Sequence, residues 1–378
     1  MIASLYRVAE SYHSSLGANQ SQSPLPLHVP VWFVRAMSSK IFVCFIRIAL
    51  TIASLSGLSN AAFAEPPKIA GFAAPGTAGE IYWQNFEDSV ATLSEGRLGA
   101  TLMVQGEAGP EETQFSGLRR NRLQMAGIST GTLGLAVPEL AVLRAPFLFE
   151  SIEEASYVLD EHLLESVAPR FAEKDLVLLS WMMDGWMDLY ATFPIREADD
   201  IRARQMRVSA DDSALLFMAA LGADVIQIPL SDVIPGMQTG LVEGGEQSTQ
   251  IFALAGLDAV ARHFTLTHHS YSTAGVVANK AWWDSLSADD RAVYRNAVPK
   301  ADWYRGLVLE RNALYLKQAA EDGLDVVYPS SEERASWQRV GQNIHGDLVR
   351  EIGGEAAELY AEIVKAKEAY AMQNAEQR

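Results

Sequence analysis

Three stretches of the chain carry side chains that could do chemistry, and the first is Gly127-Ile-Ser129-Thr-Gly131. Its G-x-S-x-G spacing is that of an α/β-hydrolase, whose serine sits on a sharp turn from strand to helix. The following residues, Leu-Gly-Leu-Ala-Val-Pro138, are a poor start for a helix. The alternative is a glycine-rich loop that lines a cleft, with Thr132 as a ligand contact.

The second stretch holds His263, His268 and His269 within seven residues. Imidazoles are good metal ligands. Adjacent residues of a strand point to opposite faces, however, so His268 and His269 would not share a site on a strand. No nearby pattern supplies clear further ligands, and a structural role is favoured.

The third stretch is the basic run Ile201-Arg-Ala-Arg-Gln-Met-Arg207-Val208. A charge run usually marks a solvated face. Arg207, however, falls at the end of an expected strand, just before Ser209, which we expect to cap an apolar helix. A guanidinium beside a helix N-terminus forms a good anion site, because the backbone N–H groups and the helix dipole add to the arginine.

Short apolar stretches alternate with helical patterns through the rest of the chain, which predicts an α/β fold with mainly parallel sheets. Ser151 and Glu154 predict a helix running to about Glu173. A long helix is expected after Pro299, and two more should close the chain. The expected strands are 68–72, 98–104, 125–129, 176–182, 224–228, 273–278 and 324–328. Ligands of such folds bind outside the carboxyl ends of strands, often between domains.

Residues 1–64 predict an upstream extension followed by a secretory signal peptide. Translation is expected to start at Met37, before Lys40 and the apolar run 41–58, and cleavage is expected after Ala64. A membrane anchor is the alternative, because ~18 apolar residues is the lower limit for a span. Arg47 interrupts this run and favours the signal peptide.

The composition of the chain argues against two classes of function. The chain has 378 residues, 49% hydrophobic and 20% charged, with a net charge of −17. Residues 1–64 contain four basic residues and one acid, so the remainder has 26 basic and 46 acidic residues and a net charge of −20. This balance disfavours nucleic-acid binding through bulk charge. The single cysteine, Cys44, also lies in 1–64, which excludes thiolate chemistry from the mature chain.

Three segments together resemble the DctP-type solute receptors of tripartite ATP-independent periplasmic (TRAP) transporters. Ala145-Pro-Phe-Leu-Phe149 resembles the family's Pro-Phe-Leu-Phe segment, and 200–208 resembles its Asp-Leu-Lys-Gly-Lys-Ile-Arg block. Gln238-Thr-Gly-Leu-Val-Glu-Gly-Gly-Glu-Gln247 resembles its Gln-x-Gly-x-Val-Asp-Gly segment. The likeness covers essentially all of 65–378.

The resemblance implies two α/β lobes that close on a small organic acid. We expect lobe I to comprise 65–184 and 273–312, and lobe II 185–272 and 313–378, with a long interdomain helix. It further implies a periplasmic protein without catalytic activity, which delivers its ligand to the small and large membrane subunits of a transporter. A secreted hydrolase using Ser129 and a sensory receptor on the same scaffold are the alternatives.

The resemblance also implies site residues. Arg207 would pair with the ligand carboxylate, and Gln247 would contact the same ligand. Many members carry a further arginine after a Gly-Phe pair, where this chain has Gly185-Trp186-Met187. A monocarboxylate, keto acid or sugar acid is therefore as plausible as a C4-dicarboxylate.

Aromatic and acidic side chains complete the expected site. Trp181, Trp186 and Tyr190 would form apolar walls of the ligand site or belong to the core. No cofactor is expected. Some relatives hold the acid through a cation, however, and Glu243 and Glu246 could ligate sodium or calcium, since both prefer oxygen ligands.

Overall fold

A single nine-stranded sheet organises the described part of the chain, and two of its strands run through both halves. The computed structural model describes residues 65–209 and 211–376, and residues 65–378 form one unit. The prediction for residues 1–64 lies outside the described residues. The strands are β1 (Lys68–Ala70), β2 (Thr101–Met103), β3 (Met125–Ser129), β4 (Leu176–Ala191), β5 (Gln205–Val208), β6 (Asp224–Gln227), β7 (Gly244–Ser248), β8 (His263–Asn279) and β9 (Asp325–Val327).

The strand order is β2-β1-β3-β8-β4-β7-β5-β6, and β9 pairs with β8. The short strands pair in parallel, whereas β4 and β8 run antiparallel to each other and to β7 and β3. The α/β fold with a sheet flanked by helices is confirmed, and five of the eight pairings between the described strands are parallel, although the longest, between β4 and β8, is antiparallel. Strand β8 is much longer than the expected 273–278, because it continues back through the three histidines.

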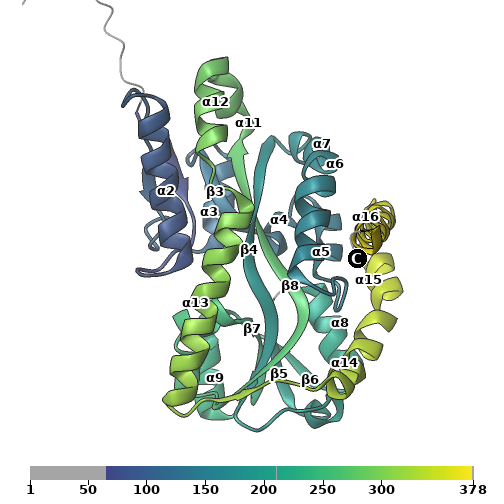
Figure 1. Ribbon diagram of the computed structural model, residues 1–378. Helices are drawn as coiled ribbons and strands as arrows, with labels where there is room; N and C mark the ends of the chain where they lie inside the picture. The colour runs from purple at the N-terminus through teal and green to yellow at the C-terminus, as the bar shows by residue number, and fades with distance from the viewer. Residues whose placement is uncertain (1–64, 210, 377–378) are drawn as a thin grey trace, which may run out of the picture. The chain divides into compact units, whose positions relative to one another are not determined.

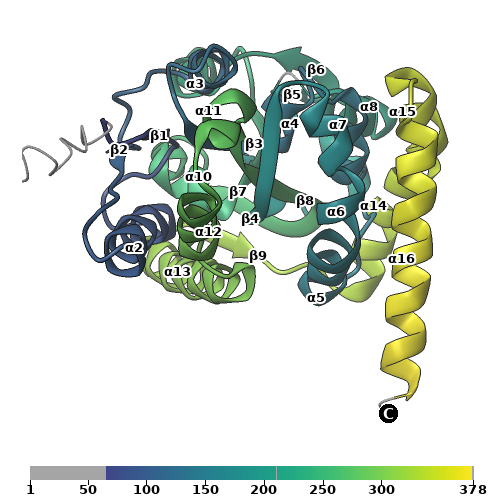
Figure 2. The ribbon, with the colours of Figure 1, turned by 90° about the horizontal axis from the view of Figure 1, so that it is seen from above.

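Helices cover both faces of the sheet (Figures 1 and 2). Those before β5 are α2 (Ala78–Leu93), α3 (Glu111–Arg119), α4 (Thr130–Leu133), α5 (Ile152–Ser156), α6 (Leu164–Ser166) and α7 (Ala168–Ala172). Those that follow are α8 (Asp212–Ala220), α9 (Val233–Thr239), α10 (Thr249–Leu254), α11 (Lys280–Ser285), α12 (Ala288–Ala297), α13 (Ala301–Glu321), α14 (Ser331–Asn343), α15 (His345–Ile352) and α16 (Ala356–Glu376). Shorter helical turns are η2 (Pro138–Arg144), η3 (Tyr157–Leu163), η4 (Ala198–Ile201), η5 (Leu230–Asp232) and η6 (Leu257–Ala259).

Two helix predictions need correction. The helix expected over 151–173 is divided into α5, the π-helical η3, α6 and α7, with Pro169 in the first turn of α7. Proline lacks an N–H and breaks a continuing helix, which accounts for the last division. Three helices rather than two close the chain, since Gly353, at φ +67°, separates α15 from α16.

Four apolar clusters hold the unit together. Two contain side chains from the half of the sheet around β1 and β3, and two from the half around β5 and β7. The expected lobe boundaries stay a prediction. Leu359 and Ile363 of α16, which we expected in lobe II, pack into the cluster that contains Phe115 and Phe171 of lobe I.

The long helix expected after Pro299 is α13, and it crosses β4 and β8 where these strands pass from one half of the sheet to the other (Figure 1). Among the described residues, no helix has both the length and the hydropathy to span a bilayer.

Candidate functional site

Arg207 lies on β5 with its side chain buried, at 3% exposure. Its Nε donates to the carbonyl oxygen of Ile228, just beyond β6, at 3.0 Å. Gly245 of β7 is its register partner, and a Cβ there would approach the carbonyl oxygen of Arg207 to 2.8 Å. The parallel strands β5 and β6 thus fix the guanidinium near their carboxyl ends, where α/β folds bind ligands.

The hydroxyl of Tyr190 on β4 is close to this guanidinium. It is buried without a hydrogen bond of good geometry among the described residues, and Arg207 is the group close enough to interact with it. Burial raises the pKa of Tyr190 to about 12, although the charge of Arg207 acts in the opposite direction. A buried polar group without a partner is costly, and such a group beside a cation marks a place where a ligand can complete the hydrogen bonding.

Glu246 and Gln247 follow each other on β7, so their side chains leave opposite faces. Glu246 is buried, and its Oε2 lies 2.8 Å from Nε2 of His269. Burial opposes ionisation of Glu246, but His269, Arg144 and Arg207 outweigh it and lower the pKa of this carboxyl. Gln247 accepts a hydrogen bond from the backbone N of Ser248 at 3.0 Å, so its side chain stays at the end of the strand.

Arg144, at the end of η2, is a second arginine, 11% exposed at its side chain, which the sequence analysis missed. Its Nη2 lies 3.4 Å from Oε1 of Glu246, and its Nε pairs with Asp211. Asp211, and not the expected Ser209, caps α8 by accepting a hydrogen bond from the backbone N of Ala214 at 3.1 Å. The helix N-terminus that we expected to bind an anion therefore already holds a carboxylate. A charged residue within the apolar run 140–149 was the signal that could have revealed Arg144.

A second wall of the site comes from the other half of the sheet. Glu111, at the start of α3, accepts hydrogen bonds from the backbone N of Ser129 at 2.9 Å and from its Oγ at 2.6 Å. It also accepts one from Oγ1 of Thr132. Ser129 caps the four-residue helix α4 after β3, where we expected a loop. Its hydroxyl therefore donates to a carboxylate, and no histidine is among its hydrogen-bond partners in 65–209 and 211–376.

Asp184 on β4 lies between these two walls. Burial raises its pKa to about 7, the charge of Glu111 adds to the increase, and Arg144 opposes it. A series of interacting charges thus runs from Glu111 through Asp184 and Arg144 to Glu246, and from there to Arg207. Thr132 lies on α4, whereas Arg207 of β5 and Gln247 of β7 share one face of the sheet and Glu246 leaves the other face.

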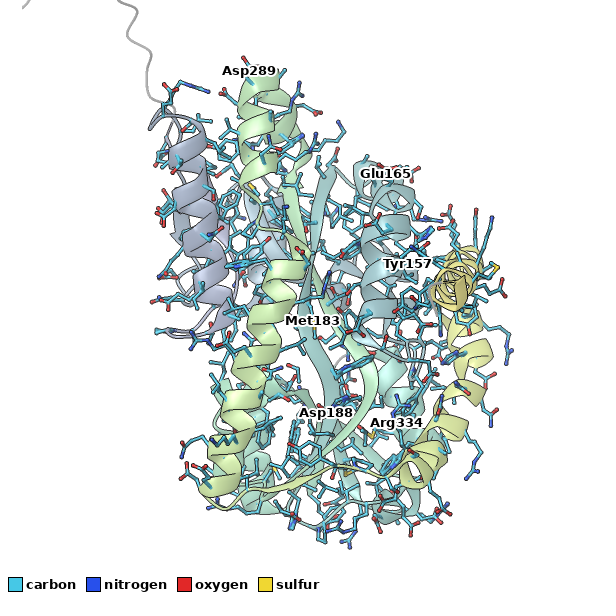
Figure 3. All side chains as sticks on the ribbon, in the orientation of Figure 1. Tyr157, Glu165, Met183, Asp188, Asp289 and Arg334 are labelled. Carbon is cyan, nitrogen blue, oxygen red and sulfur yellow. The ribbon has the colours of Figure 1, made fainter. Side chains whose placement is uncertain are left out.

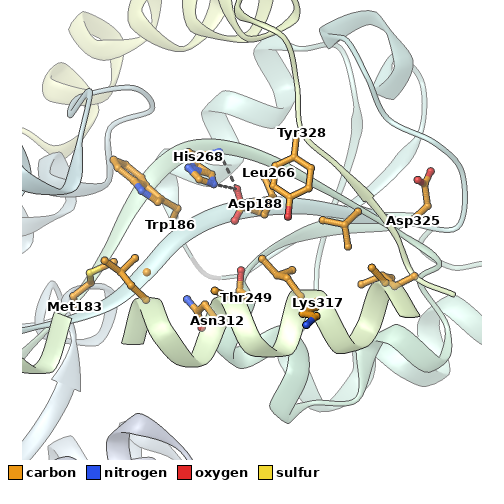
Figure 4. Close-up of a pocket in the computed structure, with 17 residues that line it drawn as sticks. Met183, Trp186, Asp188, Thr249, Leu266, His268, Asn312, Lys317, Asp325 and Tyr328 are labelled. Atoms are coloured by element: carbon orange, nitrogen blue, oxygen red, sulfur yellow. Dashed lines mark hydrogen bonds and ion pairs between the residues drawn. The ribbon is translucent and has the colours of Figure 1, made fainter. Parts of the chain in front are cut away.

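The tryptophans lie elsewhere. Trp181 is buried in the apolar cluster that contains Phe115 and Phe171. The sequence had left open whether this tryptophan lines the ligand site or belongs to the core. Trp186 stacks on His268, with ring centroids 5.7 Å apart, in a separate pocket beside α13 (Figure 4). Figure 3 shows Met183 and Asp188, which line the same pocket, on β4 in the middle of the unit.

The three histidines have separate partners. His263 pairs with Asp325 and His268 stacks on Trp186, whereas His269 bonds to Glu246. Within the described ranges, no cluster of His, Cys, Asp or Glu is placed to hold a metal ion. The expectation that His268 and His269 face opposite sides of a strand is confirmed.

Comparison with known proteins identifies the family. The model of the bacterial extracellular solute-binding proteins, family 7 (DctP), matches residues 69–352. The chain belongs to this family. Proteins of the DctP family are periplasmic solute receptors, and the α/β fold with a long helix is theirs.

Individual members of family 7 give the degree of similarity. The C4-dicarboxylate-binding periplasmic protein DctP of Rhodobacter capsulatus is 26% identical over 313 residues, which are 82% of this chain and 94% of that protein. The sugar acid binding protein of Advenella mimigardefordensis, solved with galactonate, is 26% identical with a TM-score of 0.73. That match covers 80% of this chain and 99% of the other. A TRAP solute-binding protein of Chromohalobacter salexigens, solved with D-glucuronate, is 25% identical and has the same TM-score. That match covers 79% of this chain and 99% of the other.

Proposed function

We propose that this family 7 protein captures a small hydroxylated organic acid and delivers it to the membrane subunits of a TRAP transporter. The observation that carries the proposal is the buried guanidinium of Arg207, whose Nε donates to the carbonyl oxygen of Ile228 and which lies beside the hydroxyl of Tyr190. Its terminal nitrogens remain for a carboxylate, and such bidentate pairs are among the strongest hydrogen-bonded contacts in proteins.

The other charges of the site favour a ligand with one carboxylate and several hydroxyl groups. Met187 stands where many members carry a second strand arginine, and Arg144 is already paired with Asp211 and Glu246. In the other half of the sheet, Glu111 and Asp184 are further acids, which suit hydroxyl donors and would repel a second carboxylate. Galactonate and glucuronate, the ligands of the two solved relatives, have this chemistry.

We further propose that the carboxylate meets Arg207 without a bridging cation. Glu243 pairs with Arg204 at 2.9 Å, while Glu246 is engaged by Arg144 and His269. Neither acid is left to ligate sodium or calcium.

A thermal-shift screen of organic acids with the purified protein tests the proposal. A ligand at ~100 times its dissociation constant adds ~2.7 kcal/mol to the free energy of unfolding, which is a clear rise in melting temperature. The rise should occur for monocarboxylic sugar acids and disappear in the Arg207→Ala variant. If no acid raises the melting temperature, the proposed function is wrong.

Two further parts of the proposal have their own tests. The protein should show no esterase turnover that depends on Ser129, because Glu111 and not a histidine holds that hydroxyl. Export through a cleaved signal peptide should give a mature chain that begins at Glu65, which mass spectrometry of the periplasmic fraction can measure.

A further inference from the structure

A pocket of about 720 Å³ lies between α13 and the strands β4 and β8, separate from the residues around Arg207. In Figure 4, α13 forms its lower side, and Trp186, His268 and Tyr328 lie along the strand side. Leu266, Leu309 and Leu316 add apolar surface. Its volume is within the usual range for sites of small organic molecules, and its wall is mainly apolar, as in such sites.

Asp188 is the unusual member of this pocket. Its side chain is 2% exposed, and its Oδ1 accepts a hydrogen bond from the backbone N of His268 at 2.8 Å. Its Oδ2 has no hydrogen-bond partner among the described residues. A carboxylate that is nearly fully buried is normally paired with a cation, because burying an unpaired charge is very unfavourable.

The neighbouring basic groups do not supply that cation. The imidazole Nε2 of His268 is 3.9 Å from Oδ1 of Asp188, beyond hydrogen-bond distance, and partial desolvation of this 40% exposed side chain lowers the pKa of His268. Lys317 also lines the pocket, but no ion pair joins it to Asp188 in the described residues, and Figure 4 shows its ammonium group near the helix, away from the acid. Within 65–209 and 211–376, no fixed cation is therefore paired with Asp188, and burial raises the pKa of this carboxyl well above its ordinary value. A bound cation would stabilise its charged form.

We propose that this pocket binds a small organic ammonium compound, whose cation pairs with Asp188 and whose apolar part packs among Trp186, Leu266 and Tyr328. The paired rings of Trp186 and His268 add π faces, on which ammonium groups are favourably placed. The acidic balance of the protein attracts such a cation at long range. Arg207 does not line this pocket, although Asp188 lies opposite Gln247 in the register of β4 and β7.

Benzylammonium is a suitable probe, and its neutral analogue benzyl alcohol and its anionic analogue benzoate are matched controls. Titration calorimetry of the purified protein should give saturable binding of benzylammonium below ~10 mM. Benzyl alcohol should bind at least tenfold more weakly, and benzoate should not bind. A charge-assisted hydrogen bond contributes ~1.5–3 kcal/mol, which corresponds to roughly 10- to 150-fold in affinity.

Variants locate the binding. Asp188→Asn keeps the shape of the side chain and should lower the affinity for benzylammonium at least tenfold. Asp322→Asn makes the same charge change outside the pocket and should change this affinity less than twofold. Ala313→Phe, on the helix side of the pocket, should abolish binding by filling the space. Arg207→Ala should leave it unchanged. The proposal is overturned if benzylammonium does not bind, if Asp188→Asn binds it as tightly as the unmodified protein, or if Arg207→Ala abolishes it.

Discussion

The Nε of Arg207 donates to the carbonyl oxygen of Ile228 at 3.0 Å, from one strand to the end of its parallel neighbour. This single bond fixes the plane of the guanidinium. The end-on pair of N–H groups, one from each terminal nitrogen, then points away from the Nε–H that Ile228 accepts. The predictions below follow from this geometry and from the charges around it.

Gly245 should be needed for stability and for solute binding, because no side chain fits at this position. A Cβ at this position would lie 2.6 Å from the hydroxyl of Tyr190 and 2.8 Å from the carbonyl oxygen of Arg207. Gly245→Ala should therefore lower the free energy of unfolding by ~1–3 kcal/mol and weaken solute binding, as chemical denaturation and calorimetry would measure. Gly306→Ala is the control, because Gly306 lies exposed within α13 with nothing near its Cβ. This variant should gain ~0.5–1 kcal/mol, and equal losses in both variants would contradict the argument.

Arg144 should be needed for stability. Arg144→Met leaves Asp211 and Glu246 buried without their cation, which should cost ~3–5 kcal/mol in urea unfolding. Arg350→Met breaks only the exposed pair with Asp347 and should cost less than ~1 kcal/mol. A loss below 1 kcal/mol for Arg144→Met would show that Arg144 does not stabilise these acids.

Asp184 should make stability depend on pH. Its pKa of about 7 in the folded protein is above its ordinary value, so the folded state binds more protons than the unfolded state between about pH 4 and 7. Its contribution to stability is therefore present at low pH and is lost as pH rises through this window. The free energy of unfolding should therefore fall as the pH rises from about 4 to 7. In Asp184→Asn this fall should be ~1–3 kcal/mol smaller than in the unmodified protein, measured by urea unfolding at each pH.

The exposed Asp199 provides the control for this measurement, since Asp199→Asn should leave the pH profile unchanged. An Asp184→Asn profile that is identical to that of the unmodified protein would contradict the pKa shift.

Local patterns predicted much of the fold and one side of the site. Ser151 caps α5 by accepting a hydrogen bond from the backbone N of Glu154, as the spacing of these two residues indicates. Arg207 lies on the expected strand before an apolar helix. These features depend on neighbours within a few residues, which a sequence displays directly.

The remainder depends on contacts between distant parts of the chain. Arg144 and Glu246 are 102 residues apart in sequence, and Asp188 and His268 are 80 apart. The length of β8 was missed because its pairing with β4, and not its own apolar pattern, extends it through the histidines. Trp186, expected either in the ligand wall or in the core, lies beside α13, a position set by the packing of distant segments.

The most direct test of the account is calorimetry with the tightest binder found among organic acids, on the unmodified protein and on Arg207→Ala and Arg207→Lys. Removing one partner of a buried charge pair costs ~2–5 kcal/mol, so Arg207→Ala should bind roughly 30- to 3,000-fold more weakly. Arg207→Lys should also lose affinity, because an ammonium group lacks the planar fork. An unchanged dissociation constant in Arg207→Ala would contradict the central claim.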